Sequence, residues 1–255
     1  MTLPAKQRVR DSFERAAATY DAAAVLQREI CRRLLSGFDR ELEPSSIVDA
    51  GCGTGYGLQL LRARWPRAHL VAVDFAPAML TLARPHADLT LAGDIEALPC
   101  PNQTFAAWWS NLTVQWCQLD RALAEAWRVL RPGGCLALST LGPDTFHELR
   151  LAFAGIDDYR HTLAFSESVA INDALAHAGF VRVRLVRQPV IVHYPDLKAL
   201  LRAVKDIGAS SVGDGARSGM FGRQAWSRVQ TAYEEHRTVA GLPARYDVIL
   251  AYASK

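Results

Sequence analysis

The sequence contains few cysteines, and none of them is paired at metal-binding spacing. The five cysteines stand at positions 31, 52, 100, 117 and 135, an odd number without a CxxC motif. This pattern argues against a disulfide framework and against a zinc site, and it favours a reducing compartment. The chain also has no apolar run of transmembrane length, and its N-terminus is charged, unlike a secretory signal. We therefore expect a cytoplasmic protein that uses no metal and binds no membrane.

The chain also lacks a strong excess of charge. Its net charge is +3 over 255 residues, which is too small to indicate nucleic-acid binding. Basic residues do gather locally: Lys198, Arg202 and Lys205 are spaced to share one face of a helix predicted after Pro195. Such a face is often only solvated surface, but it would suit an acidic protein partner by steering its approach.

Low-complexity linkers and internal repeats are absent as well. A chain of 255 residues with 50% hydrophobic content can bury a large core. We therefore predict a single α/β domain over residues 1–255. Its parts are an N-terminal helical lid (1–40), a nucleoside-binding core (41–194), a helical insertion (195–244) and a last strand (245–255). Residues 5–38 of the lid are predicted to form two helices with Thr19-Tyr20-Asp21 between them.

The most informative motif that is present is a glycine-rich turn between a β-branched strand and a helix. Asp49 precedes three alternating glycines, Gly51, Gly53 and Gly55, which let the backbone approach a ligand closely. A dinucleotide-binding loop would have another glycine at position 56, where this chain has Tyr56. The loop therefore fits a pyrophosphate poorly. It fits S-adenosylmethionine better, since a carboxylate at position 49 can approach the α-ammonium group of that molecule.

Further polar residues follow the next predicted strands at βα-unit spacing. Asp74 is placed to accept hydrogen bonds from two ribose hydroxyls, and Phe75 beside it completes this part of the predicted cofactor site. Asp94 is placed for the adenine amino group, with the Ile95 backbone N–H for a ring nitrogen. Asn111 ends the fourth strand, where the methionine part would lie. Taken singly, each acid could be an ordinary helix cap or turn residue.

Together these positions resemble the class I S-adenosylmethionine-dependent methyltransferase superfamily over residues 46–140. The resemblance implies a Rossmann-like, mostly parallel seven-stranded sheet with an antiparallel last strand. Residues 180–185 then read as strand six and residues 246–252 as the closing strand, with a Gly/Ser-rich candidate lid at 208–222 between them. A nicotinamide-dependent dehydrogenase is the alternative, but Tyr56 and Asp49 argue against it.

Motifs outside the glycine loop narrow the resemblance. They are the N-terminal VRDSFERAA with Tyr20-Asp21, NLTVQWC from Asn111, GPDTFHELR from Gly142 and VKDIGA from Val204. Together they are similar to the malonyl-acyl carrier protein O-methyltransferase family of biotin synthesis. Methyltransferases of other small carboxylic acids, such as trans-aconitate, share part of this pattern. A methyltransferase of a free acid or a quinone, and a nucleoside-binding protein without catalysis, are further alternatives.

The family resemblance implies methyl transfer to the free carboxylate of malonyl-acyl carrier protein or malonyl-coenzyme A. A carboxylate is already ionised at neutral pH, so the reaction requires no general base. Arg150 is our first candidate for holding that carboxylate, because a guanidinium group offers a planar fork of donors. Tyr20 and Gln115 are further candidates, and His147 would serve as a base only for a hydroxyl or amine nucleophile. Each of these residues could instead be structural.

Overall fold

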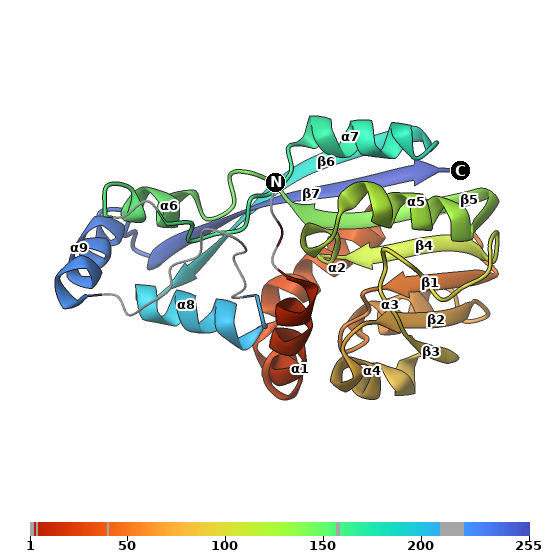
Figure 1. Ribbon diagram of the computed structural model, residues 1–255, viewed down its shortest axis with the longest axis horizontal. Coiled ribbons are helices and arrows are strands. Elements are labelled where there is room, and N and C mark those ends of the chain that lie inside the picture. The colour runs from red at the N-terminus through yellow and green to blue at the C-terminus, as the bar shows by residue number, and fades with distance from the viewer. Residues whose placement is uncertain (1–2, 4, 40, 157–158, 210–221) are drawn as a thin grey trace.

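The computed structural model describes residues 3, 5–39, 41–156, 159–209 and 222–255 (Figure 1). Its centre is one seven-stranded sheet in the order β3-β2-β1-β4-β5-β7-β6. The strands are β1 (Ser46–Ala50), β2 (His69–Asp74), β3 (Leu89–Ala92), β4 (Phe105–Asn111), β5 (Leu130–Leu141), β6 (Val181–Tyr194) and β7 (Leu242–Ser254). Strands β1 to β5 pair in parallel, and β7 runs antiparallel to both of its neighbours. The predicted Rossmann-like sheet is confirmed.

Helices cover both faces of this sheet because its strands are apolar on both sides. One face packs on α2 (Val25–Gly37), α3 (Tyr56–Arg64) and α4 (Pro77–Ala83). The other face packs on α5 (Leu119–Val129) and α7 (Ser168–His177). In β1, for example, Ile47 belongs to the first core and Val48 to the second. This double cover is typical of parallel sheets, and it leaves the carboxyl ends of the strands as the place for a ligand.

The N-terminal segment forms two helices, as predicted, but the break between them differs. Helix α1 spans Lys6–Ala23 and α2 begins at Val25, so Tyr20 and Asp21 lie in the last turn of α1. The sequence analysis placed these residues between the helices. They remain helical because no glycine or proline interrupts the turn. Tyr20 is consequently held by a regular helix.

Strands β6 and β7 are longer than predicted and form a hairpin that extends past the end of β5. Strand β6 continues to Tyr194, where the sequence analysis ended it at position 185, and β7 begins at Leu242. The pairing of β5 with β7 stops at Leu141↔Val248, whereas β6 and β7 stay paired to Tyr194↔Leu242. The strand continues with a regular alternation of burial, because the side chains at even positions from 186 to 194 are half-buried and those between them are exposed.

The helical insertion before the last strand is present at the end of this hairpin. It contains α8 (Leu197–Asp206) and α9 (Arg223–Glu234), and α6 (His147–Phe153) contacts α9 from the segment after β5 (Figure 1). Most of the candidate lid at 208–222 lies outside the described residues. Among the helices that the structure describes, none combines the length and the apolar character needed to cross a membrane.

Candidate active site

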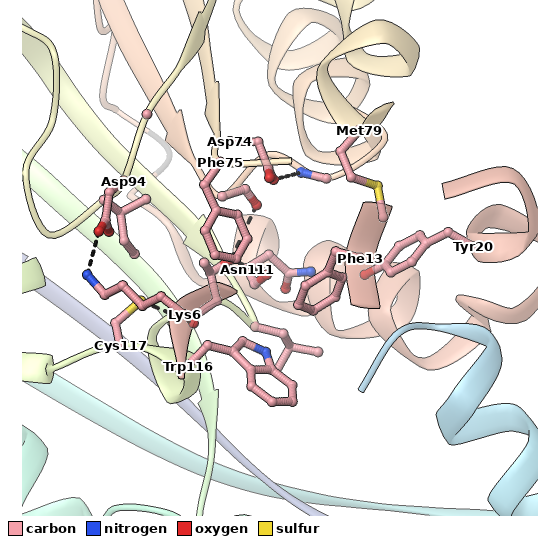
Figure 2. Close-up of a pocket in the computed structure, with 16 residues that line it drawn as sticks. Lys6, Phe13, Tyr20, Asp74, Phe75, Met79, Asp94, Asn111, Trp116 and Cys117 are labelled. Carbon is pink, nitrogen blue, oxygen red and sulfur yellow. Dashed lines mark hydrogen bonds and ion pairs between the residues drawn. The ribbon is translucent and has the colours of Figure 1, made fainter. Parts of the chain in front are cut away.

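A cavity opens at the carboxyl ends of β1, β2 and β4, and helix α1 covers it (Figure 2). It encloses about 640 Å³, part of which is open to solvent. The predicted cofactor residues that line it are Gly51, Gly53, Asp74, Phe75, Asp94, Ile95 and Asn111. A smaller cavity of about 430 Å³ adjoins it and is lined by Asp49 together with Gly51, Gly53 and Asn111. The structure therefore brings together eight of the nine residues that we predicted from sequence.

Gly55 is the ninth, and it lines neither cavity. It has a φ of +91° at the N-terminus of α3, and an added Cβ would lie 2.9 Å from the backbone of Ala83 in α4. The absence of a side chain thus allows α3 and α4 to approach each other. Gly53 differs, because an added Cβ there would meet no atom within 4 Å. The space beside Gly53 belongs to the cavity.

Asp74 ties the glycine loop to the end of β2. Its Oδ2 accepts a 2.9 Å hydrogen bond from the backbone N–H of Gly53, and its Oδ1 accepts one from Ala76, also at 2.9 Å. Burial raises the pKa of Asp74 to about 6, and these backbone donors hold it from rising further. The carboxylate lines the cavity and also fixes the conformation of the glycine loop. Asp74 can therefore contact a ligand and stabilise the turn at the same time.

Asp49 is the most deeply placed acid of the site. Its side chain is buried, and no hydrogen bond to its carboxylate occurs among the described residues. Burial, with the nearby Asp74 charge, raises the pKa of Asp49 to about 8. A Cβ on Gly57 would lie 2.7 Å from Asp49 Oδ2 and 3.1 Å from Nε1 of Trp109, a buried donor that lacks a hydrogen-bond partner in the part of the chain described. The unpartnered carboxylate of Asp49, which lines the smaller cavity, suits a cationic group such as an α-ammonium.

Two cations at the cofactor cavities were missed in the sequence analysis. Arg28 on α2 lines the smaller cavity, where its Nη1 donates a 2.5 Å hydrogen bond to the carbonyl of Asp21. Lys6 on α1 lines the larger one and forms ion pairs with Asp94 and, at 2.9 Å, with Glu96 (Figure 2). The side chain of Glu96 is only 2% exposed. Both basic residues lie in the N-terminal helices that we predicted as a lid. This position was the feature of the sequence that could have pointed to them.

A second and larger cavity adjoins the first. It encloses about 1,040 Å³, again partly open, and most of its lining is aliphatic or aromatic. The two large cavities share four lining residues, namely Phe13, Tyr20, Leu112 and Trp116. Leu112 has a φ of +53°, and its N–H donates to the carbonyl and hydroxyl oxygens of Ser139 at 3.1 and 3.0 Å. A strained residue fixed in this way at the junction is typical of a functional site.

Polar groups of the second cavity come from several elements. Tyr20 reaches it from α1, and burial, followed by the Asp74 and Asp21 charges, raises the pKa of its hydroxyl well above the ordinary value. Gln115 donates a 2.7 Å hydrogen bond to the carbonyl of Leu112, which fixes its amide at the cavity wall. His161 also lines the cavity and stacks on Phe153 at 3.6 Å between ring centroids. The sequence analysis did not select His161.

Arg150 and His147 lie outside both cavity linings. Arg150 is half-buried on α6, and its Nη1 donates to the backbone carbonyl of Thr145 five residues earlier. His147 is exposed at the start of the same helix. The guanidinium of Arg150 thus stabilises the turn after β5 in this structure. Tyr20 and Gln115 line the second cavity whereas Arg150 does not, and the roles predicted for these three side chains stay predictions.

Comparison with known proteins shows the family of this chain. A family model described as a methyltransferase domain matches residues 48–138. A malonyl-[acyl-carrier protein] O-methyltransferase of Dechloromonas aromatica is 51% identical over 255 residues, covering 100% of this chain and 96% of the relative. The chain belongs to this family. A relative of the same description from Laribacter hongkongensis is 43% identical and covers 97% of this chain and 89% of its own length.

Solved structures share the fold of this methyltransferase. A methyltransferase from Thermotoga maritima, described as a possible histamine N-methyltransferase, is 19% identical with a TM-score of 0.60, covering 96% of this chain and 99% of that one. Phosphoethanolamine N-methyltransferase 2 of Haemonchus contortus, in complex with S-adenosyl-L-methionine, is 15% identical with a TM-score of 0.57 and covers 95% and 57%. The enzyme is an S-adenosylmethionine-dependent methyltransferase, and the Asp49 carboxylate at the smaller cavity fits the α-ammonium group of that cofactor.

Proposed function

We propose that the protein methylates the free carboxylate of malonyl-acyl carrier protein with S-adenosylmethionine, giving a malonyl methyl ester for biotin synthesis. One observation carries this proposal beyond the family relationship. The cofactor cavity meets a large, mostly apolar cavity at Phe13, Tyr20, Leu112 and Trp116. An acyl thioester is long and mostly uncharged, and a cavity of this size and lining suits it better than it suits a small tricarboxylate.

The cofactor supplies an electrophilic methyl group on sulfur when it is bound. We assign Asp49 to its α-ammonium and Arg28 to its α-carboxylate, since both line the smaller cavity. Asp74 is assigned to the ribose hydroxyls, and Asp94 with the Ile95 N–H to the adenine. With the cofactor held in this way, we expect the reacting carbon to lie at the junction of the two large cavities. The contribution of the chain is then to fix the position of both partners and to exclude water.

The substrate carboxylate attacks without a base because it is ionised at neutral pH. The Tyr20 hydroxyl keeps its proton, since burial raises its pKa, so it can donate a hydrogen bond to one carboxylate oxygen. Within the described residues this hydroxyl has no hydrogen-bond partner of its own. The second oxygen stays free to attack the methyl carbon. Gln115 has one amide hydrogen left for the acyl chain, because Leu112 takes the other.

A methyl-transfer assay read by mass spectrometry tests the proposal. Malonyl-carrier protein, malonyl-coenzyme A, free malonate and trans-aconitate are compared at equal concentration, with acetyl-carrier protein as the control that lacks a carboxylate. We expect a gain of one methyl group on the malonyl thioesters and none on the acetyl control. Turnover of trans-aconitate without turnover of any malonyl thioester would overturn the assignment in favour of a small-acid methyltransferase.

A further inference from the structure

The outer surface of α8 carries a row of cations that the cofactor and acyl sites do not use. Lys198, Arg202 and Lys205 are all exposed, and none forms an ion pair within the described part of the chain. Their spacing places them within a sector of roughly 60° at 3.6 residues per turn. Two acids flank the row: Asp196 caps the helix by accepting a 2.8 Å hydrogen bond from the Ala199 N–H, and Asp206 ends it.

The inner side of the same helix forms a wall of the second cavity. Leu201 and Val204 line that cavity, as does Ile207 just beyond the helix. In the helical projection Leu201 falls next to Lys205 and Lys198, so the cationic row begins directly beside the cavity wall. A ligand that leaves the cavity past α8 therefore meets these three side chains first.

Helix α1 extends the cationic surface from the neighbouring side, because α1 and α8 are in contact (Figure 1). The hydroxyl of Thr19 donates a 3.3 Å hydrogen bond to the carbonyl of Asp206, and a Cβ on Gly208 would lie 3.1 Å from the carbonyl of Ser12. Arg8 and Arg15 share the α1 stripe of Ser12 and Thr19, and both are exposed.

The acids of α1 are placed differently: Glu14 faces α4, whereas Asp11 lies on the same side of α1 as Arg8 and Arg15, at i+3 and i−4 spacing. The Glu14 carboxylate accepts hydrogen bonds from the Ala78 N–H on α4, and Asp11 accepts one from Gln7. The α1–α8 basic surface, defined as Arg8, Arg15, Lys198, Arg202 and Lys205, thus gathers five cations on a chain whose net charge is only +3. Such a concentration of one sign attracts a partner of the opposite sign and raises its association rate.

We propose that the α1–α8 basic surface is the docking surface for the carrier protein, an acidic partner whose phosphate-linked arm enters the second cavity beside α8. This inference rests on the proposed function. Negative charges on the carrier and on the phosphate of its arm would complement the cations, while the apolar part of the arm and the malonyl group occupy the cavity. The surface raises affinity for the carrier and leaves the chemistry at Tyr20 unchanged.

The test compares one substrate that has the carrier with one that lacks it. The double variant Lys198→Glu/Arg202→Glu is assayed with malonyl-carrier protein and with malonyl N-acetylcysteamine thioester, which has the reacting group but neither protein nor phosphate. Arg121→Glu, an exposed charge reversal on α5 without an ion pair in the described residues, is the matched control. Arg8→Glu tests the α1 part of the surface.

We expect the KM for malonyl-carrier protein to rise about tenfold or more in the double variant, with kcat and the rate on the small thioester unchanged. The wild-type KM should also rise with salt, and the double variant should lose most of that dependence. A carrier KM in the double variant equal to that of Arg121→Glu would overturn the docking proposal, and so would an equal loss on both substrates. Wild-type enzyme that methylates no malonyl thioester would instead overturn the proposed function itself.

Discussion

The cofactor half and the acyl half of this molecule are built in different ways. The cofactor cavities are formed at the ends of parallel strands, by loops only a few residues long and by carboxylates that hydrogen bond to the backbone. The second cavity is enclosed by side chains from α1, α6 and α8 and from the segments around them. Its position depends on a hairpin and on packed helices. A ligand site formed at strand ends can be recognised in the sequence as a motif. A site enclosed by packed helices appears in the sequence mainly as apolar residues.

The largest expected effect is the loss of Asp74 from the cofactor half. Asp74→Ala removes the acceptor for the ribose and also the anchor of the Gly53 N–H. We expect the dissociation constant of S-adenosylmethionine to rise roughly 30- to 150-fold, corresponding to about 2 to 3 kcal/mol for hydrogen bonds to a charged group. Isothermal titration calorimetry measures it. Asp74→Asn is the matched control, which keeps the shape and loses the charge. An unchanged dissociation constant in Asp74→Ala would show that Asp74 only stabilises the turn.

Tyr20→Phe tests the junction between the two halves. The hydroxyl is expected to hold one oxygen of the substrate carboxylate, so its removal should lower kcat/KM by about tenfold or more while cofactor affinity stays within about twofold. Arg150→Lys is the informative partner variant. If Arg150 held the substrate carboxylate, Arg150→Lys would also lower kcat/KM by at least about tenfold. We expect near-native rates from Arg150→Lys, because its guanidinium is engaged by the Thr145 carbonyl. A large loss in Arg150→Lys with a native-like Tyr20→Phe would reverse this assignment.

Cofactor affinity should depend on pH through Asp49. A carboxyl with a pKa of about 8 is mostly protonated at pH 7, and only its ionised form pairs with the α-ammonium. Affinity should therefore fall by about tenfold for each pH unit below 8. Above pH 8 it should level off, since the carboxyl is then already ionised. Titrations between pH 6.5 and 8 in wild type and Asp49→Asn check this. A variant with the same pH slope as wild type would show that another group controls binding.

The smallest expected effect concerns Lys6, which connects α1 to the adenine end of the cofactor cavity. Its side chain is 43% exposed, so the ion pairs with Asp94 and Glu96 are screened by solvent. We expect Lys6→Met to weaken cofactor binding by about two- to fivefold and to remove part of its salt dependence. Fluorescence titration at low and high salt measures both. Faster cofactor dissociation with an unchanged association rate would show that the ion pairs keep α1 closed.

The sequence predicted the cofactor half well for a physical reason. Asp49, Asp74 and Asp94 stand at or just beyond the carboxyl ends of β1, β2 and β3, and the geometry of a parallel sheet brings strand ends to one edge whatever the side-chain packing. Arg150 shows the limit of this reasoning. Its position after β5 is on the correct side of the sheet, but the direction of a side chain on a seven-residue helix depends on local contacts that spacing does not encode. The length of β6 was missed for a similar reason, since its end is set by pairing with β7.

The β6–β7 hairpin has a consequence for how this enzyme can diversify. Beyond Val248, the paired residues 189–194 and 242–247 form a two-stranded ribbon whose β7 side is not paired with β5. Insertions at its end, where α8 and α9 stand, change the acyl cavity without altering the register of the five parallel strands. The acyl half can therefore change between related enzymes while the cofactor half stays the same. The end of this two-stranded ribbon is also a suitable place to graft a different acyl pocket onto this methyltransferase.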